Sequence, residues 1–92
     1  MGEDNVAELL SGEQPVEHRE LSFGERAVGL TFNPSGDPAV TKVKQTFAAI
    51  IDQMNDLRNS SGSAGVKRHA STAITMAEDA QMRAVKALTW KD

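Results

Sequence analysis

The chain contains no cysteine, which excludes both a disulfide framework and a thiolate metal site. Large aromatic side chains are scarce, with one Trp and three Phe among 92 residues. A chain of this length forms one small domain that is only marginally stable alone. Its core must therefore come from Ala, Val, Ile, Leu and Met. This composition favours helices that pack closely against one another and against further copies of the chain.

Long apolar runs are absent as well. No stretch approaches the roughly 20 apolar residues that span a bilayer, so no membrane association is expected. The acidic N-terminus is unlike a signal or transit peptide. We therefore expect a cytoplasmic protein.

Enzymatic motifs are also missing. His18 and His69 lie far apart, and neither has the spacing to a second ligand that metal sites use. Glu78 and Asp79 are adjacent on an expected helix, hence about 100° apart, which is a poor geometry for acid–base pairing. The chain has no GxSxG, P-loop or GxGxxG sequence. The sequence predicts no enzyme and no cofactor.

The net charge of −3 is unevenly distributed. Residues 1–26 hold seven acids and two bases, whereas residues 27–92 hold six acids and eight bases. An acidic protein is a poor binder of polymeric DNA or RNA, because that affinity depends on many phosphate contacts. A small ligand with two or three phosphates needs only the few cations of the second region.

Apolar periodicity predicts an antiparallel helical hairpin, with helices at about 38–58 and 64–88. The first helix has a heptad seam, and a polar loop at 59–65 follows it. The second has an alanine-rich seam beside another apolar stripe. These seams are Val40, Val43, Phe47, Ile50, Met54 and Leu57, then Val66, Ala70, Ala73, Ala77, Ala80, Ala84 and Ala87, with the stripe Ile74, Gln81, Val85 and Leu88. Two apolar faces on one helix predict a second subunit, hence a homo-oligomer.

The N-terminal third divides into an acidic segment at 1–17 and an arm at 18–33, extended or partly helical, that packs on the hairpin domain of 18–92. The turn after Asn33 leads to Asp37 and Pro38, which fit the N-cap and first position of the helix. A rigid turn that presents N–H groups before Lys44 is either an anion site or simply a well-made helix start.

Several residues are candidates for binding an anionic ligand. Lys44 lies beside the apolar seam, and Arg68, Thr72 and Thr75 share one helical face. A guanidinium can stack on a purine while hydroxyls one and two turns later contact phosphate. His18 and Arg19 add a flat ring and a cation on the arm. For each of these residues the alternative is an ordinary solvated surface.

Three blocks of sequence resemble the phage helical-hairpin family of cyclic-nucleotide sponges, which includes anti-CBASS and anti-Thoeris proteins. They are GLTFNPSGDPAV at 29–40, VKQTFAAIID at 43–52 and AITMAEDAQMRAVKALTW at 73–90. The resemblance covers roughly residues 17–90. It implies a small homo-oligomer, often a hexamer, that binds cyclic oligonucleotide signals in the cytoplasm of the bacterial host without cutting them.

The resemblance also implies site residues. In the short anti-CBASS members an N-terminal Tyr-Arg-x-Leu-Ser/Thr segment and a helix lysine hold a cyclic dinucleotide, which points here to His18 with Arg19 and to Lys44. A second pocket, for cyclic trinucleotides, would use Arg68 with Thr72 or Thr75. Asn33 is a further candidate ligand contact, and Phe32 is expected to pin the arm.

This chain departs from the short members in two respects: histidine replaces the tyrosine, and the 32–38 segment is inserted. The choice among cyclic dinucleotides, trinucleotides and cyclic ADP-ribose isomers therefore stays open. A helical oligomerisation or adaptor module that docks a partner protein on its second apolar stripe is the alternative function.

Overall fold

Ser22, Asp37 and Ser63 each begin a helix in the computed structural model, which describes residues 19–92. Within that range all regular structure is helical: α2 is Phe23–Ala27, α3 is Pro38–Ser60 and α4 is Ala64–Leu88. This confirms the all-α prediction. The expected acidic segment at 1–17 and His18 lie outside the described residues.

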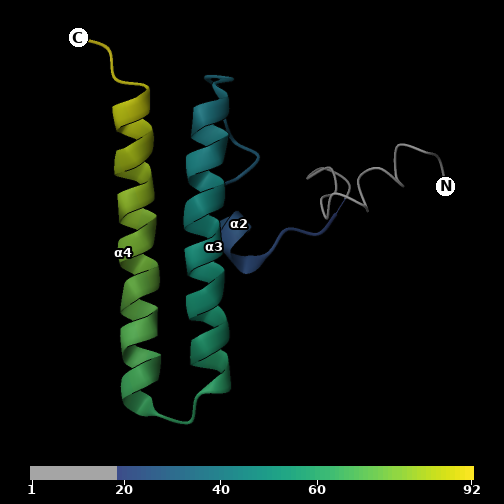
Figure 1. Cartoon of the computed structure of the whole chain (residues 1–92), viewed down its shortest axis with the longest axis vertical. Helices are drawn as coiled ribbons and strands as arrows, with labels where there is room; N and C mark the ends of the chain where they lie inside the picture. The colour runs from purple at the N-terminus through teal and green to yellow at the C-terminus, as the bar shows by residue number, and fades with distance from the viewer. Residues whose placement is uncertain (1–18) are drawn as a thin grey trace, which may run out of the picture.

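The two long helices form the predicted antiparallel hairpin (Figure 1). Asp37 accepts a hydrogen bond from the Ala39 N–H at 2.9 Å, and Pro38 occupies the first turn, as the sequence predicted. Ser63 caps α4 through the Val66 N–H. The predicted bounds of α4 are confirmed, and α3 continues two residues beyond the predicted 58. Neither these helices nor α2 is long and apolar enough to cross a membrane.

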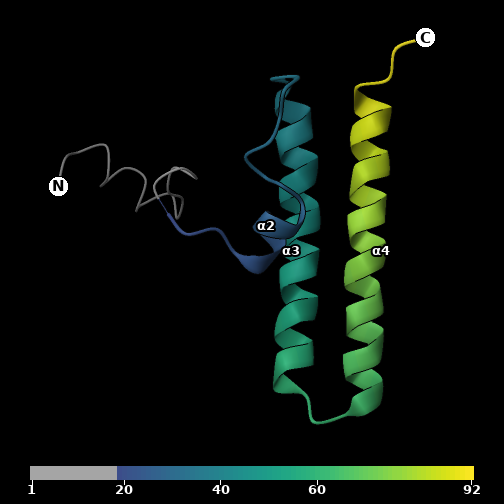
Figure 2. The ribbon, with the colours of Figure 1, turned by 180° about the vertical axis from the view of Figure 1, so that it is seen from behind.

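The arm before α3 folds back so that α2 packs on α3 (Figure 2). A capping box begins α2, because Ser22 and Glu25 each accept a hydrogen bond from the other's backbone N–H. A Schellman motif ends it, with Gly29 at φ 63° and bonds from Leu30 N–H to Glu25 O and from Gly29 N–H to Arg26 O. Thus the arm is locally helical, then turns tightly.

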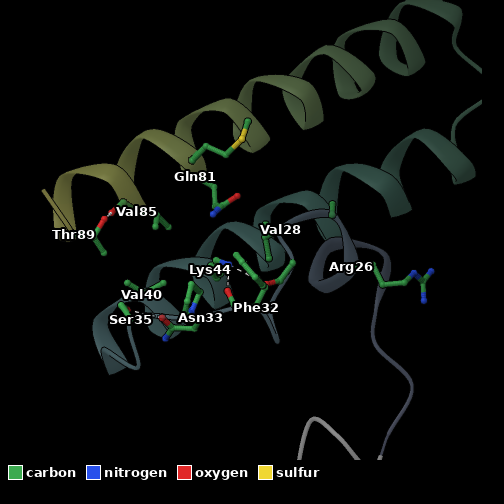
Figure 3. Close-up of a pocket in the computed structure, with 14 residues that line it drawn as sticks. Arg26, Val28, Phe32, Asn33, Ser35, Val40, Lys44, Gln81, Val85 and Thr89 are labelled. Atoms are coloured by element: carbon green, nitrogen blue, oxygen red, sulfur yellow. Dashed lines mark hydrogen bonds between the residues drawn. The ribbon is translucent and has the colours of Figure 1, made fainter.

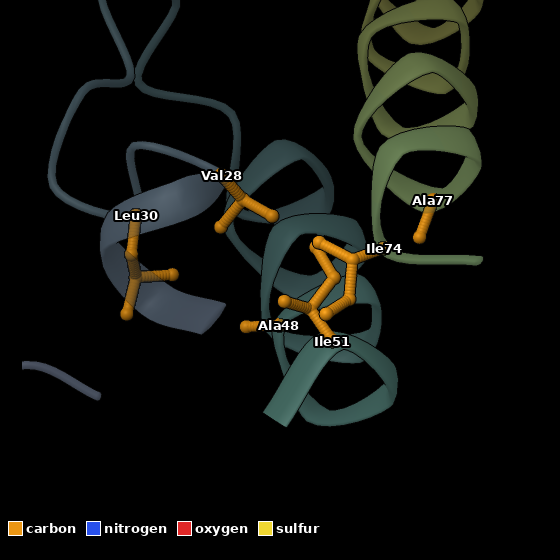
Figure 4. Packing of buried hydrophobic residues seen from close by; sticks show 6 residues of the cluster. All are labelled: Val28, Leu30, Ala48, Ile51, Ile74 and Ala77. Atoms are coloured by element: carbon orange, nitrogen blue, oxygen red, sulfur yellow. The ribbon is translucent and has the colours of Figure 1, made fainter. Parts of the chain in front are cut away.

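The core lies where the arm, α3 and α4 meet. Figure 4 shows the six buried apolar residues of this cluster, which are Val28, Leu30, Ala48, Ile51, Ile74 and Ala77. Ile51 is fully buried and is the largest side chain to be so in the described residues. The arm thus supplies two of the core residues, in keeping with the expectation that it packs on the hairpin.

The predicted seams are partly wrong. The side chains that α3 buries are Val40, Lys44, Ala48 and Ile51, and those that α4 buries are Ala70, Ile74, Ala77 and Gln81. Ile50 and Leu57, expected in the seam of α3, are 44% and 43% exposed. The buried face of α3 is rotated toward Lys44 and Ala48 because α2 and the following turn pack there. Ile74, predicted to lie in the second apolar stripe of α4 beside the alanine seam, is part of the hairpin core.

Gly24 allows the close approach of α2 to α3. Its N–H donates a 2.7 Å hydrogen bond to Asp52 Oδ1, so the two backbones are held together at this point. A Cβ on residue 24 would collide with the Ala48 carbonyl group, lying 2.9 Å from its carbon. The contact leaves no room for a side chain.

Gly24→Ala should therefore destabilise the protein by about 1–3 kcal/mol, as overpacking of a filled contact does. Thermal unfolding followed by circular dichroism, at matched protein concentration, measures this. Gly62→Ala is the control, because nothing lies within 4 Å of a Cβ at that position. Equal melting temperatures for the two variants would contradict the close-packing interpretation.

Candidate functional site

Lys44 is buried, with 5% of its surface exposed, although it is charged. Its ammonium group donates hydrogen bonds to the carbonyls of Gly29, at 2.9 Å, and Phe32. The Phe32 ring also lies near it, with 5.5 Å between Nζ and the ring centroid. The solvated-surface alternative is therefore wrong for Lys44. Since an ammonium has three N–H bonds, one remains beyond the two that these carbonyls accept.

The turn after α2 supplies those carbonyls. The left-handed conformation of Gly29 reverses the chain, and Phe32 N–H closes the turn by donating to Gly29 O at 2.9 Å. Both carbonyls then face α3, where Lys44 lies. The lysine thus fixes the turn to the helix, and the turn holds the ammonium in place.

A pocket of about 630 Å³ lies between this turn and the C-terminal half of α4, with Lys44 among its lining residues (Figure 3). Most of its wall is apolar, from Val28, Phe32, Val40, Met82 and Val85 among others. Its polar lining consists of Arg26, Asn33, Ser35, Lys44, Gln81 and Thr89. An apolar cavity of this volume with a few polar groups is the usual form of a small-molecule site.

The turn at 33–37 is a self-contained helix start. The Asn33 amide donates to Asp37 O at 2.9 Å and to Thr41 Oγ1 at 3.1 Å, and its oxygen accepts from Ser35 Oγ at 2.6 Å. Backbone N–H groups of the turn are engaged as well, Gly36 N–H with Asn33 O and Asp37 N–H with Ser35 Oγ. The helix-start alternative is therefore the better description. Asn33 lines the pocket, but its amide is already engaged.

Phe32 does not pin the arm as expected. Its side chain is 70% exposed on the rim of the pocket, whereas its carbonyl holds Lys44. The apolar anchors of the arm are instead Val28 and Leu30, both 4% exposed. An aromatic ring is thus presented toward the pocket.

Arg19 is engaged within the arm. Its guanidinium donates two hydrogen bonds to the carboxylate of Glu25, at 2.7 and 2.6 Å. These bonds, together with the one from Ser22 N–H, lower the pKa of Glu25 from 4.5 to about 2 against the opposing effect of desolvation. Arg19 does not line the pocket. Its position stabilises the start of α2.

Arg68, Thr72 and Thr75 lie on an exposed face of α4. Thr72 Oγ1 donates to Arg68 O at 3.0 Å, and Thr75 Oγ1 donates to Ser71 O at 3.4 Å. Arg68 precedes Gln81, a lining residue of the pocket, by 13 positions, or about 20 Å of helix. Within one chain the structure therefore brings together Lys44 and Asn33 but keeps the Arg68 group separate.

Sequence reasoning missed Arg26, Phe32 and Gln81 as lining residues. Arg26 lines the pocket because of the way the arm folds, and the spacing of apolar residues in the sequence does not predict that fold. Gln81 had a signal, because it interrupts an otherwise apolar stripe with an amide. The sequence contains no similar signal that places Phe32 at the rim of the pocket.

The fold and the pocket define a small helical-hairpin protein with a site suited to an anionic small molecule. The chain belongs to the Acb2/Tad1 hairpin-domain family, whose model matches residues 25–89. This is the family of phage anti-CBASS and anti-Thoeris sponges, anti-defence proteins that act by binding cyclic nucleotides. Comparison with curated proteins and with solved structures gives no significant match.

The Arg19–Glu25 pair predicts acid sensitivity. Because the pKa of Glu25 is lowered to about 2 in the folded protein, the pair stabilises the fold fully above pH 4.5. That stabilisation is lost as the pH falls from about 4.5 to 2. Urea unfolding at pH 6, 4 and 2 should show the stability difference between wild type and Glu25→Gln shrinking with acidification. A difference independent of pH would contradict this.

Proposed function

We propose that this chain is a phage immune-evasion protein that sequesters host cyclic di- or trinucleotides and so blocks CBASS-type antiphage signalling. The observation that supports it best is the buried ammonium of Lys44 in the wall of a 630 Å³ pocket. A cation on an apolar background suits a ligand that combines phosphates with flat bases. Family membership supports the same chemistry.

In this proposal Lys44 contacts a phosphate with its remaining N–H, and the exposed ring of Phe32 stacks on a base. Stacking on an aromatic ring is worth about 1–3 kcal/mol per base. The ligand stays intact, because binding alone lowers the free signal below the level that activates the host effector. No covalent step is required.

We further propose that the working unit is a homo-oligomer, with a hexamer as the favoured form. Large apolar side chains on α4 and just after it are exposed in the single chain, with Met76 at 64%, Leu88 at 45% and Trp90 at 61%. A neighbouring subunit would cover them. His18 and Arg19 then reach the dinucleotide pocket across a subunit interface, although within one chain Arg19 is bound to Glu25. Arg68 with Thr72 or Thr75 belongs to a second pocket for trinucleotides that several subunits build.

The same exposed side chains support a second candidate function, a helical adaptor that docks a partner protein. It differs in what it predicts for Lys44. A docking surface on the outer face of α4 does not depend on a buried lysine in the pocket, so ligand binding separates the two candidates.

Titration calorimetry with cyclic di-AMP, cyclic di-GMP, cyclic tri-AMP and a cyclic ADP-ribose isomer tests the sponge directly. At least one ligand should bind with a dissociation constant below about 1 µM, equivalent to 8 kcal/mol. Heat denaturation of the complex should return that ligand intact. If none of these ligands bound, the adaptor function would be favoured. Recovery of linear, cleaved nucleotides would contradict sequestration.

Lys44→Met should weaken binding of a pocket ligand by roughly 10- to 100-fold, the value of a charge-assisted hydrogen bond. Lys42→Met is the matched control, because Lys42 is exposed and two positions away on the same helix. Since Lys44 also fixes the turn, circular dichroism must first show that both variants are folded. Equal affinities for the two variants would contradict the assignment of Lys44.

A further inference from the structure

Gln81 is a buried amide in the packed face of α4. Its side chain is 4% exposed, and its neighbours in that face, Ala77 and Ile74, are apolar. Within residues 19–92 the amide makes no hydrogen bond to another residue, whereas no fully shielded side-chain nitrogen or oxygen there lacks a partner. The amide therefore retains access to the pocket that it lines.

A purely structural residue in this packed face would not need an amide. The carbon stem of Gln81 is packed, as an apolar residue of similar size would be, while its amide faces the pocket and is free to pair with a ligand. Asn33 gives the contrast within the same pocket, because its amide has three partners. Figure 3 shows the Gln81 amide projecting from α4 toward the side of the pocket where Lys44 lies.

We propose that Gln81 is a specificity-determining residue that recognises the edge of an adenine base in this pocket. A glutamine amide offers one acceptor beside two donors, which pair with the N6 amino group and N7 of adenine. The corresponding edge of guanine presents two acceptors, O6 and N7, and leaves the amide oxygen unpaired. This inference rests on the proposed function, because it assigns a base to the same site.

The three groups then divide the recognition of an adenine nucleotide. Phe32 lies at the rim, where a ring can stack on the base, and Lys44 supplies positive charge for a phosphate. Stacking and charge act on every base alike. Of these three groups only the Gln81 amide can pair with a base edge, so in this proposal selectivity among cyclic dinucleotides depends on it.

The test is a ratio of affinities, for cyclic di-AMP against cyclic di-GMP, measured by calorimetry. Wild type should favour cyclic di-AMP by at least about fivefold, the lower value for a bidentate amide–base pair. Gln81→Met, which keeps the length of the side chain and removes the amide, should bring the ratio close to one. The control Gln53→Met, at an exposed position of α3, should keep the wild-type ratio.

A measurement on wild type decides the matter even where Gln81→Met fails to fold. The side-chain amide resonances of Gln81 in a ¹H–¹⁵N spectrum should shift on addition of cyclic di-AMP. A wild-type ratio near one, an unchanged ratio in folded Gln81→Met, or unshifted resonances would overturn this inference and leave the proposed function standing. If the wild-type protein bound none of the cyclic nucleotides, both this inference and the proposed function would be overturned.

Discussion

The buried ammonium of Lys44 is the interaction on which the arrangement of the site depends. It joins α3 to the carbonyls of Gly29 and Phe32, and thereby holds the turn that forms one wall of the pocket. A buried charge is tolerated only where hydrogen bonds replace those that it loses to water. The turn provides two such acceptors, so the lysine and the turn require each other.

That pairing depends in turn on where α2 sits. Gly24 brings α2 against the backbone of α3, and the Asp52 carboxylate fixes it there. The Arg19–Glu25 pair and the capping box stabilise the helix itself, which at five residues is too short to persist alone. The short helix α2, fixed by its caps and by the close contact of Gly24 with the α3 backbone, thus determines the direction of the turn that follows it.

The sequence predicted the ends of the long helices well, because caps such as Asp37–Pro38 and Ser63 are local signals. It predicted the packed faces less well. A heptad seam identifies apolar positions, but the arm decides which of them are covered, and it covers Ala48 and the stem of Lys44 rather than Ile50 and Leu57. Pocket residues such as Gln81 lie where three segments meet, and periodicity within one helix contains no information on such a junction.

The chemistry of Lys44 also favours holding an anion over transforming one. A general base needs a free lone pair, whereas this ammonium already donates to two carbonyls and has one N–H bond to offer. An ammonium held by two carbonyls, with a single donor left, fits the phosphate contact proposed above. A held cation, an aromatic rim and an amide open to the pocket are groups of recognition, and they fit the proposed sequestration, in which affinity comes from preorganised groups.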